Sequence, residues 1–348
     1  MKSGLAKVLH PILGRPILGH VLAAVLETDP QNVVVVVGHQ REQVTAYLAS
    51  HFPGVHTAVQ DEQNGTGHAV RCALAGLAED GIELPSEPIV VLAGDTPLLT
   101  GQTRADLVVT HERAHAAVTV LSADLENPFG YGRIVRDGDG NVMAIVEQKD
   151  ATAEQALVHE INSGMFAFDP TTLVDALARL TTDNSQGEEY LTDVLAIARG
   201  DGRTVAVHKA PDPDEVHGIN NRAQLAAAAA LLRDRINLGH MTAGVTIVDP
   251  ATAWIEPGAV IAPDAVIERN TSIDATSAVG SGAVIGPDTS LIDTTVEAEA
   301  EVLRSQCLSA HIGAGASVGP FSYLRPATSL GAGGRIGAFV EVKKSTIG

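Results

Sequence analysis

The chain has 348 residues, and its 45% hydrophobic and 19% charged residues are typical of a globular protein with two or three domains. A formal net charge of −19 argues against a nucleic-acid partner, because phosphate backbones bind basic surfaces. No apolar run approaches the roughly 20 residues of a membrane span. The two distant cysteines, Cys72 and Cys307, form no disulfide or metal pattern. We therefore expect a cytoplasmic protein without a membrane span.

The chain opens with a basic segment, MKSGLAKVLHPILGRP, which Pro and Gly interrupt before any apolar run long enough for a core strand. No apolar stretch follows the lysines, so the segment does not resemble a secretory signal. Folded domains rarely begin in this way. We expect a part of the fold to precede it.

Strands and helices are predicted to alternate along residues 8–215, which indicates an α/β domain with a mostly parallel sheet. Ligands of such sheets bind at the carboxyl ends of the strands. The predicted strands are 33–37 (VVVVV), 88–99, 116–121 and 162–170, the helices are 41–50, 69–77 and 188–200, and a hairpin pairs 133–135 with 142–146.

A different pattern follows a predicted connecting helix at 219–238, which is rich in Ala and Leu. Aliphatic residues recur with a period of six, which predicts a parallel β-helix of roughly five coils rather than a β-sandwich of period two. The register breaks at Glu297; Leu303 fits it, and a three-residue shift restarts it. The periodic positions are Ile255, Ile261, Ile267, Ile273, Val279, Ile285 and Leu291, then Ile312, Val318, Leu324, Leu330, Ile336 and Val342.

Two short motifs of the first half carry candidate chemistry. LAGDTPLL places Asp95 at the carboxyl end of a core strand, where it could hold Mg²⁺ against a nucleotide phosphate. Taken alone, a turn or helix-capping aspartate explains Asp95 equally well. The Gly-rich loop QDEQNGTGHA at 60–69 leads into a helix whose first amides could bind a base or a phosphate.

Many motifs occur in a fixed order along the whole chain. They are KVLHPILGRP (7–16), VVVVVGH (33–39), QNGTGHA (63–69), AGD (93–95), GYGRI (130–134), IVEQKDA (145–151), EINSG (160–164), QGEEYLTD (186–193), GINNR (218–222), LRP (324–326) and FVEVKKSTIG (339–348). In this order they closely resemble the bacterial bifunctional N-acetylglucosamine-1-phosphate uridylyltransferase/glucosamine-1-phosphate N-acetyltransferase family.

The resemblance implies an α/β Rossmann-like nucleotidyltransferase domain followed by a hexapeptide-repeat left-handed parallel β-helix. It implies a uridylyltransferase domain at 1–217, a linker helix at 218–240 and an acetyltransferase β-helix at 241–348. Family members begin with a strand and a loop of the form LAAGxGTRM, and Met1 matches the last residue of that loop. The β-helix also ends without a polar cap. We therefore expect the chain to be truncated at both ends.

The resemblance also assigns a uridylyltransferase site to the first half. The reaction would be attack of N-acetylglucosamine 1-phosphate on UTP with Mg²⁺. Without the resemblance, a solvated lysine, a helix cap and a solvated hairpin residue would explain Lys7, Asn220 and Glu147. The implied residues are Lys7 for the phosphates, Gln60, Gly65 and Thr66 for uracil, Ala93, Gly94 and Asp95 at the strand end, Asp95 and Asn220 for the metal, and Gly132, Glu147 and Asn162 for the sugar, with Lys7 and Asp95 catalytic.

In the second half, Arg325 and Lys343 match the family residues that bind the phosphate of glucosamine 1-phosphate. Without the motif context, a solvated face of the solenoid would be the favoured explanation of each. In this family the catalytic histidine and further acceptor- and acetyl-CoA-binding residues follow the FVEVKKSTIG motif, so we expect this chain to lack acetyltransferase activity. His311 reads as a turn residue. The family also implies a homotrimer. Ala6, Ala93 and Ala327 depart from its usual pattern.

Two other functions stay open at this point. The chain could be a single-function sugar-1-phosphate nucleotidyltransferase with a regulatory or assembly β-helix, which Arg325 and FVEVKKSTIG argue against. It could also be a non-catalytic scaffold. Retention of Lys7, Asp95 and Asn220 argues against that function, whereas the missing glycine loop favours it.

Overall fold

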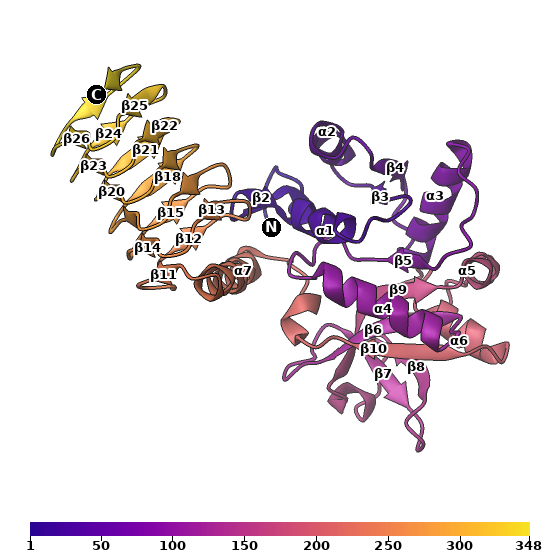
Figure 1. The fold of residues 1–348 in the computed structure, drawn as a ribbon. Helices are drawn as coiled ribbons and strands as arrows, with labels where there is room; N and C mark the ends of the chain where they lie inside the picture. The colour runs from indigo at the N-terminus through magenta and orange to yellow at the C-terminus, as the bar shows by residue number, and fades with distance from the viewer. The chain divides into compact units, whose positions relative to one another are not determined.

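The computed structural model describes all of residues 1–348. The chain divides into two compact units (Figure 1). The larger unit contains Met1–His10 and Pro16–Asn221, and the smaller contains Pro11–Arg15 and Arg222–Gly348. No helix of either unit combines the length and the apolar character that crossing a membrane would need.

The main sheet of the larger unit is organised around one long strand, β9 (Glu160–Phe168). The expected mostly parallel sheet is wrong, because β9 runs antiparallel to β5, β6 and β7 and only β10 and β6 pair in parallel. The predicted hairpin of β7 and β8 is confirmed. The other strands are β5 (Ile89–Val91), β6 (Val118–Asp124), β7 (Gly132–Arg136), β8 (Val142–Val146) and β10 (Val205–Lys209).

The two halves of β9 pair with different strands on one of its sides. The second half pairs with β5, where Val91 lies opposite Phe166, and the first half pairs with β7, where Gly132 lies opposite Asn162. Since β5 runs antiparallel to β9, its carboxyl end is directed toward the start of β7. The long strand therefore places the AGD segment and the GYGRI segment along one edge.

A separate parallel pair consists of β3 (Val34–Val37) and β4 (His56–Val59), joined by α2 (Arg41–His51). The predicted strand at 33–37 is confirmed, but only Val37 is buried, because β3 hydrogen-bonds to a strand on one side only. The helices α3 (Thr66–Glu79) and α2 pack against this pair.

The remaining elements cover the main sheet or connect its strands. The helix expected at 188–200 starts at Asp193, because the preceding Glu189 hydrogen-bonds with Asn64 and Gly67 in the Gly-rich loop. These elements are α1 (Ile17–Leu26), α4 (Gly101–Arg113), α5 (Pro170–Leu177), α6 (Asp193–Gly200), η1 (Lys7–Leu9), η2 (Gln155–Leu157) and η3 (Pro213–Val216). The short ribbon of β1 (Pro11–Ile12) and β2 (Arg15–Pro16) belongs to the smaller unit up to Arg15.

The smaller unit is a parallel β-helix preceded by α7 (Arg222–Thr242). Three parallel sheets of six strands form its sides, so it has six coils rather than five, and the extra coil starts at Thr246, before the first predicted position. The first sheet contains β11 (Thr246–Ile247), β14 (Val266–Ile267), β17 (Val284–Ile285), β20 (Glu301–Val302), β23 (Ser317–Val318) and β26 (Arg335–Ile336); the second β12 (Trp254–Ile255), β15 (Ser272–Ile273), β18 (Ser290–Ile292), β21 (Gln306–Leu308), β24 (Tyr323–Leu324) and β27 (Glu341–Val342); the third β13 (Val260–Ile261), β16 (Ala278–Val279), β19 (Thr295–Val296), β22 (Ala310–Ile312), β25 (Thr328–Leu330) and β28 (Thr346–Ile347).

The predicted aliphatic positions face the interior of the β-helix, but the break in their register differs from the expected one. Between Leu291 and Ile312 the repeat continues through the buried residues Val296, Val302 and Cys307, and Leu303 does not belong to the core. Three of the four steps between these inward residues therefore span five residues instead of six, and together they account for the three-residue shift. Burial raises the pKa of the Cys307 thiol to about 12.

The helix α7 closes the first coil of the β-helix. The Asn237 side chain is fully buried and donates hydrogen bonds to the carbonyls of Pro250 and Ala253, at 2.9 and 3.0 Å. Ile236 and Met241 of the same helix pack against the aliphatic core. Solenoids need such caps because their end coils otherwise expose apolar surface.

Removing an aliphatic side chain from this core should be far more destabilising than removing the same atoms from its surface. Ile285 is fully buried, whereas Ile292 is 37% exposed. We expect Ile285→Ala to lower the free energy of unfolding by about 2–5 kcal/mol and Ile292→Ala by less than about 1 kcal/mol, measured by urea denaturation. Equal losses would contradict the assignment of the inward face.

Candidate functional site

Three distant segments of the larger unit meet at the ammonium group of Lys7. Its Nζ donates hydrogen bonds to Asp95 Oδ2 at 2.6 Å and to Asn220 Oδ1 at 3.0 Å. Lys7 begins η1, Asp95 follows the end of β5, and Asn220 follows η3. The amide of Ile219 donates to the carbonyl of Asp95 at 3.0 Å, which fixes the Asn220 segment beside the strand end. Three of the sequence-predicted residues therefore form one cluster.

The oxygen atoms of this cluster fit a magnesium ion. Carboxylate and amide oxygens are typical Mg²⁺ ligands, and the ion commonly takes one or two from the protein and the rest from substrate phosphates and water. The structure contains no group of three or more His, Cys, Asp or Glu residues suited to a metal. The Lys7 ammonium lies where Asp95 and Asn220 converge, so their oxygens already bind a cation.

Gly132, Glu147 and Asn162 form a second cluster at the start of β7. Gly132 pairs with Asn162 across the sheet, and a Cβ on Gly132 would lie 3.3 Å from Glu147 Oε1. Burial raises the pKa of Glu147, and the nearby charges of Asp150 and Asp193 raise it further. The cluster presents a carboxyl group and an amide beside a backbone with no side chain, which suits the binding of a polar ring.

The Gly-rich loop forms a third cluster after β4. Gln60 Nε2 donates to the carbonyl of Gly65 at 3.0 Å. Gly65 has a φ of 108°, and a Cβ there would lie 2.7 Å from Glu189 N, so only glycine fits. The Thr66 hydroxyl at the start of α3 accepts from the amide of Leu191 at 3.0 Å. Two of these contacts join the loop to the segment at 189–191, and none joins it directly to Asp95.

Tyr131 links the first two clusters, and sequence reasoning missed it. Its side chain makes a hydrogen bond with the backbone of Gly218 and lies close enough to Asp95 to interact with its charge. Burial and the Asp95 charge raise the pKa of Tyr131, and the Gly218 hydrogen bond opposes them. The aromatic residue between the two glycines of GYGRI was the available signal.

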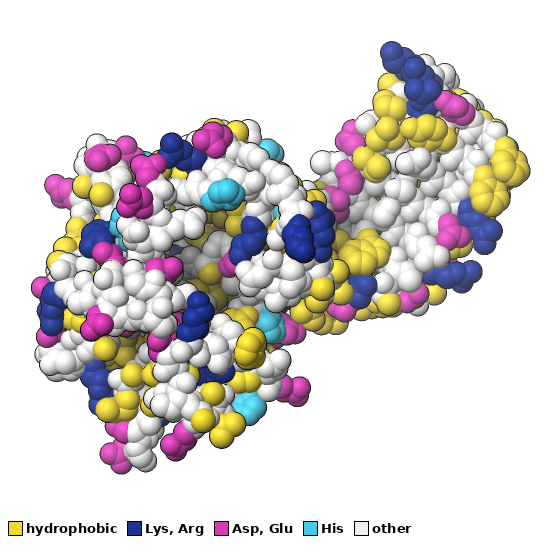
Figure 2. Space-filling view, turned by 180° about the vertical axis from the view of Figure 1, so that it is seen from behind, with side chains coloured by type: hydrophobic (Ala, Val, Ile, Leu, Met, Phe, Trp, Pro, Cys, Tyr) yellow, Lys and Arg dark blue, Asp and Glu magenta, His cyan; other side chains and the backbone are white.

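In the β-helix, Arg325 and Lys343 follow paired strands of neighbouring coils. Leu324 pairs with Val342, so the two cationic residues after them are adjacent along the same sheet. Arg325 Nη1 donates to Glu341 Oε1 at 2.8 Å, and both partners are partly exposed. Figure 2 shows Lys and Arg side chains gathered at one end of the β-helix. Two adjacent cations can bind a phosphate.

His311 differs from its predicted place. It lies within β22, not in a turn, and its Nε2 is 2.9 Å from Glu297 Oε1. Its side chain is on the outer surface of the coil and about half exposed.

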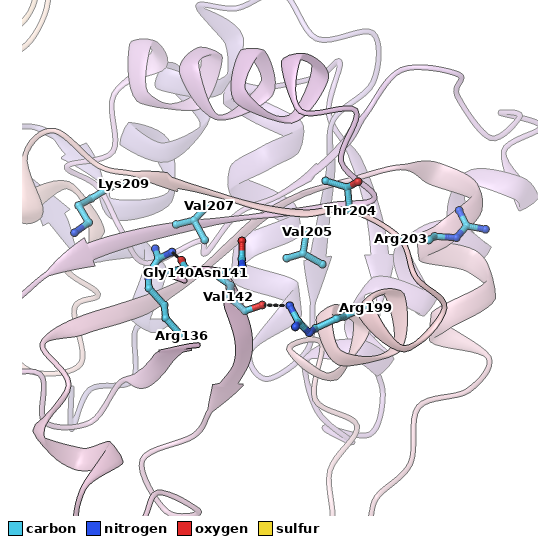
Figure 3. A pocket seen from close by; sticks show the side chains of 10 residues that line it. All are labelled: Arg136, Gly140, Asn141, Val142, Arg199, Arg203, Thr204, Val205, Val207 and Lys209. Atoms are coloured by element: carbon cyan, nitrogen blue, oxygen red, sulfur yellow. Dashed lines mark hydrogen bonds between the residues drawn. The ribbon is translucent and has the colours of Figure 1, made fainter. Parts of the chain in front are cut away.

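A cavity of about 440 Å³ lies between β10 and the β7–β8 hairpin, apart from all these clusters (Figure 3). Arg136 is paired with Glu160 and Lys209 with Asp124, Arg199 donates to the Val142 carbonyl, and Arg203 extends away from the other side chains in Figure 3. Because the charged side chains that line this cavity already bind other groups of the protein, the cavity is not the candidate site. Its lining residues are Arg136, Gly140, Asn141, Val142, Arg199, Arg203, Thr204, Val205, Val207 and Lys209.

An α/β domain with a Lys–Asp–Asn cluster at a strand end, followed by a β-helix, defines the class of sugar nucleotidyltransferases with a solenoid. The family model described as nucleotidyl transferase matches residues 2–212. Over the whole chain, 53% of residues are identical to "Bifunctional protein GlmU" of Streptomyces coelicolor, 54% to that of Streptomyces avermitilis and 48% to that of Mycobacterium tuberculosis. The chain covers 72%, 72% and 70% of these relatives. It belongs to the GlmU family, and its β-helix is consistent with the predicted left-handed form.

The lysine cluster predicts a specific response of metal binding. Lys7→Met removes the cation that now lies on Asp95 and Asn220, so the nucleotide-free protein should bind Mn²⁺ about three- to tenfold more tightly, measured by electron paramagnetic resonance. The gain should vanish in the double variant Lys7→Met/Asp95→Ala.

Lys209→Met is the matched control, since it breaks a Lys–Asp pair of 2.7 Å elsewhere in the larger unit. An equal gain in Mn²⁺ affinity in Lys7→Met and Lys209→Met would show that the gain comes from the change in overall charge. Weaker Mn²⁺ binding by Lys7→Met would show that Lys7 does not compete with a metal.

Proposed function

We propose that this chain takes part in making UDP-N-acetylglucosamine by two successive reactions. Glucosamine 1-phosphate is first acetylated on its amine by acetyl-CoA, and the resulting N-acetylglucosamine 1-phosphate then receives a uridylyl group from UTP. The observation that carries the proposal is the Lys7–Asp95–Asn220 cluster at the end of β5, in a member of the GlmU family.

The uridylyl transfer needs no general base, because the attacking sugar phosphate is already ionised. An oxygen of that phosphate forms a bond with the α-phosphorus of UTP, the bond from this phosphorus to the bridging oxygen breaks, and pyrophosphate leaves. Positioning and charge neutralisation account for most of the catalysis of such reactions. The Lys7 ammonium would bind phosphate oxygens as a point charge.

Asp95 and Asn220 would hold Mg²⁺, which supplies positive charge to the phosphates when it is bound. Their oxygens already converge on a cation. Ala93 and Gly94 precede Asp95 at the strand end and would let the nucleotide approach the backbone.

The other two clusters would bind the two organic ends of the substrates. Glu147 and Asn162 would hydrogen-bond the N-acetylglucosamine ring above the bare backbone of Gly132. Gln60, Gly65 and Thr66 would bind uracil, which agrees with their place at the carboxyl end of β4 and the start of α3.

The β-helix would bind the acceptor of the acetyl transfer, a reaction that also needs the family's catalytic histidine, which matches no residue of this chain. Arg325 and Lys343 would bind the phosphate of glucosamine 1-phosphate, while the amine attacks the thioester of acetyl-CoA, an amide forms and the thiol leaves. A purely regulatory solenoid has no need of such a cationic pair, so we favour the bifunctional activity over a single-function transferase.

We also propose a homotrimeric state and a cytoplasmic place of action. Phe321 and Phe339 stack with ring centroids 5.3 Å apart on neighbouring coils, and they are 53% and 81% exposed. Such an exposed apolar pair suits a contact between subunits. Both cysteines are unpaired, which fits a reducing compartment.

Removal of the Asp95 carboxylate tests the nucleotidyl transfer. We expect Asp95→Ala to slow pyrophosphate release from UTP and N-acetylglucosamine 1-phosphate by at least about 100-fold. Asp175→Ala, which removes an exposed carboxylate paired with Arg179, is the control and should change the rate less than twofold. A rate that Asp95→Ala leaves unchanged would refute the proposed site.

A further inference from the structure

Arg133 is buried without a counterion. It is the largest fully buried side chain of the protein, only 2% exposed, and it forms no ion pair with any carboxylate. Its Nε has no hydrogen-bond partner. Burying a guanidinium without a counterion costs free energy, which points to a structural role of its hydrogen bonds.

The hydrogen bonds of Arg133 join two separate loops. Nη1 donates to the carbonyl of Tyr131, and Nη2 donates to Gln148 Oε1 at 2.8 Å. Gln148 Oε1 also accepts from the amide of Gly130 at 3.1 Å. One guanidinium and one side-chain amide therefore connect the loop before β7 with the segment after β8.

The residues next to these contacts are those of the sugar cluster. Gly132 lies between Tyr131 and Arg133, and Glu147 directly precedes Gln148. The gap between the Glu147 carboxylate and the Gly132 backbone is narrow, so a small shift of either loop would change the space for a sugar ring. Through Tyr131 the same connection reaches Gly218, beside Asp95.

We infer that Arg133 and Gln148 form a positioning clamp that sets the binding geometry of the amino-sugar phosphate acceptor. This inference rests on the proposed function and deepens it. The clamp touches neither reacting atom, so its loss should affect the acceptor more than UTP, which the Lys7 and Gln60 clusters would bind.

The test compares four variants of the full chain. Arg133→Met and Gln148→Leu should each raise the KM for N-acetylglucosamine 1-phosphate about tenfold, with the KM for UTP changed less than twofold. The double variant should be no worse than either single variant, because both remove one connection. Gln148→Glu keeps the bridging oxygen and should retain near-normal KM values.

Arg136→Met is the matched control, since it removes the next arginine of β7, which pairs with Glu160 instead. It should lower the melting temperature and leave both KM values unchanged. If Arg133→Met fails to fold, Gln148→Leu still tests the clamp. An unchanged acceptor KM, or an equal rise for UTP, would overturn the inference.

A readout independent of turnover separates this inference from the proposed function. Amide hydrogen exchange of residues 129–132 should speed up in Gln148→Leu and stay unchanged in Arg136→Met, because only the former loses the acceptor for the Gly130 amide. Absence of pyrophosphate release from the unaltered chain would refute the proposed function alone. Unchanged exchange in Gln148→Leu would refute the clamp.

Discussion

The ammonium group of Lys7 is held between the oxygens of Asp95 and Asn220, and this contact orders the site of the larger unit. It joins segments separated by 88 and 213 positions in the sequence. One carboxylate and one amide oxygen would bind a divalent ion weakly on their own, so phosphate oxygens would have to complete its coordination. Nucleotide binding would offer Lys7 a new anionic partner and release both oxygens at once. Metal and nucleotide would then bind together.

The long strand β9 supplies the second constraint. Because β5 and β7 pair with its two halves, the residues proposed for the metal and those proposed for the sugar lie along one edge, and Tyr131 links them. A parallel sheet alone would place Asp95 at a strand end but would not bring the start of a hairpin beside it. The antiparallel pairing of β9 is therefore what brings the two groups of residues to the same edge.

The sequence predicted the periodic and local features of this fold well. Each aliphatic residue at the six-residue period from Ile255 to Leu291 faces the core, because burial demands one apolar side chain per side of the coil. Leu303 was wrongly included in that pattern, since Val302 next to it is equally apolar and only backbone geometry shows which of the two points inward. The pairing of the strands could not be predicted either, because a hydrophobic run indicates a strand but not the strands to which it hydrogen-bonds.

The candidate site shows the same limit. Motifs named Lys7, Asp95 and Asn220, and the structure brings these three together, but their direct contact depends on tertiary geometry. Arg133 was overlooked because an arginine in a strand is normally read as exposed, and its burial follows from loops that close over it.

The central claim is that Lys7 and a divalent metal share the oxygens of Asp95 and Asn220. The most direct measurement is a crystal structure of the protein with UTP and Mn²⁺, located by its anomalous scattering. The account predicts Mn²⁺ on Asp95 and Asn220, with the Lys7 ammonium moved onto a phosphate. Mn²⁺ bound elsewhere, or Lys7 still on Asp95 with the nucleotide in place, would contradict it.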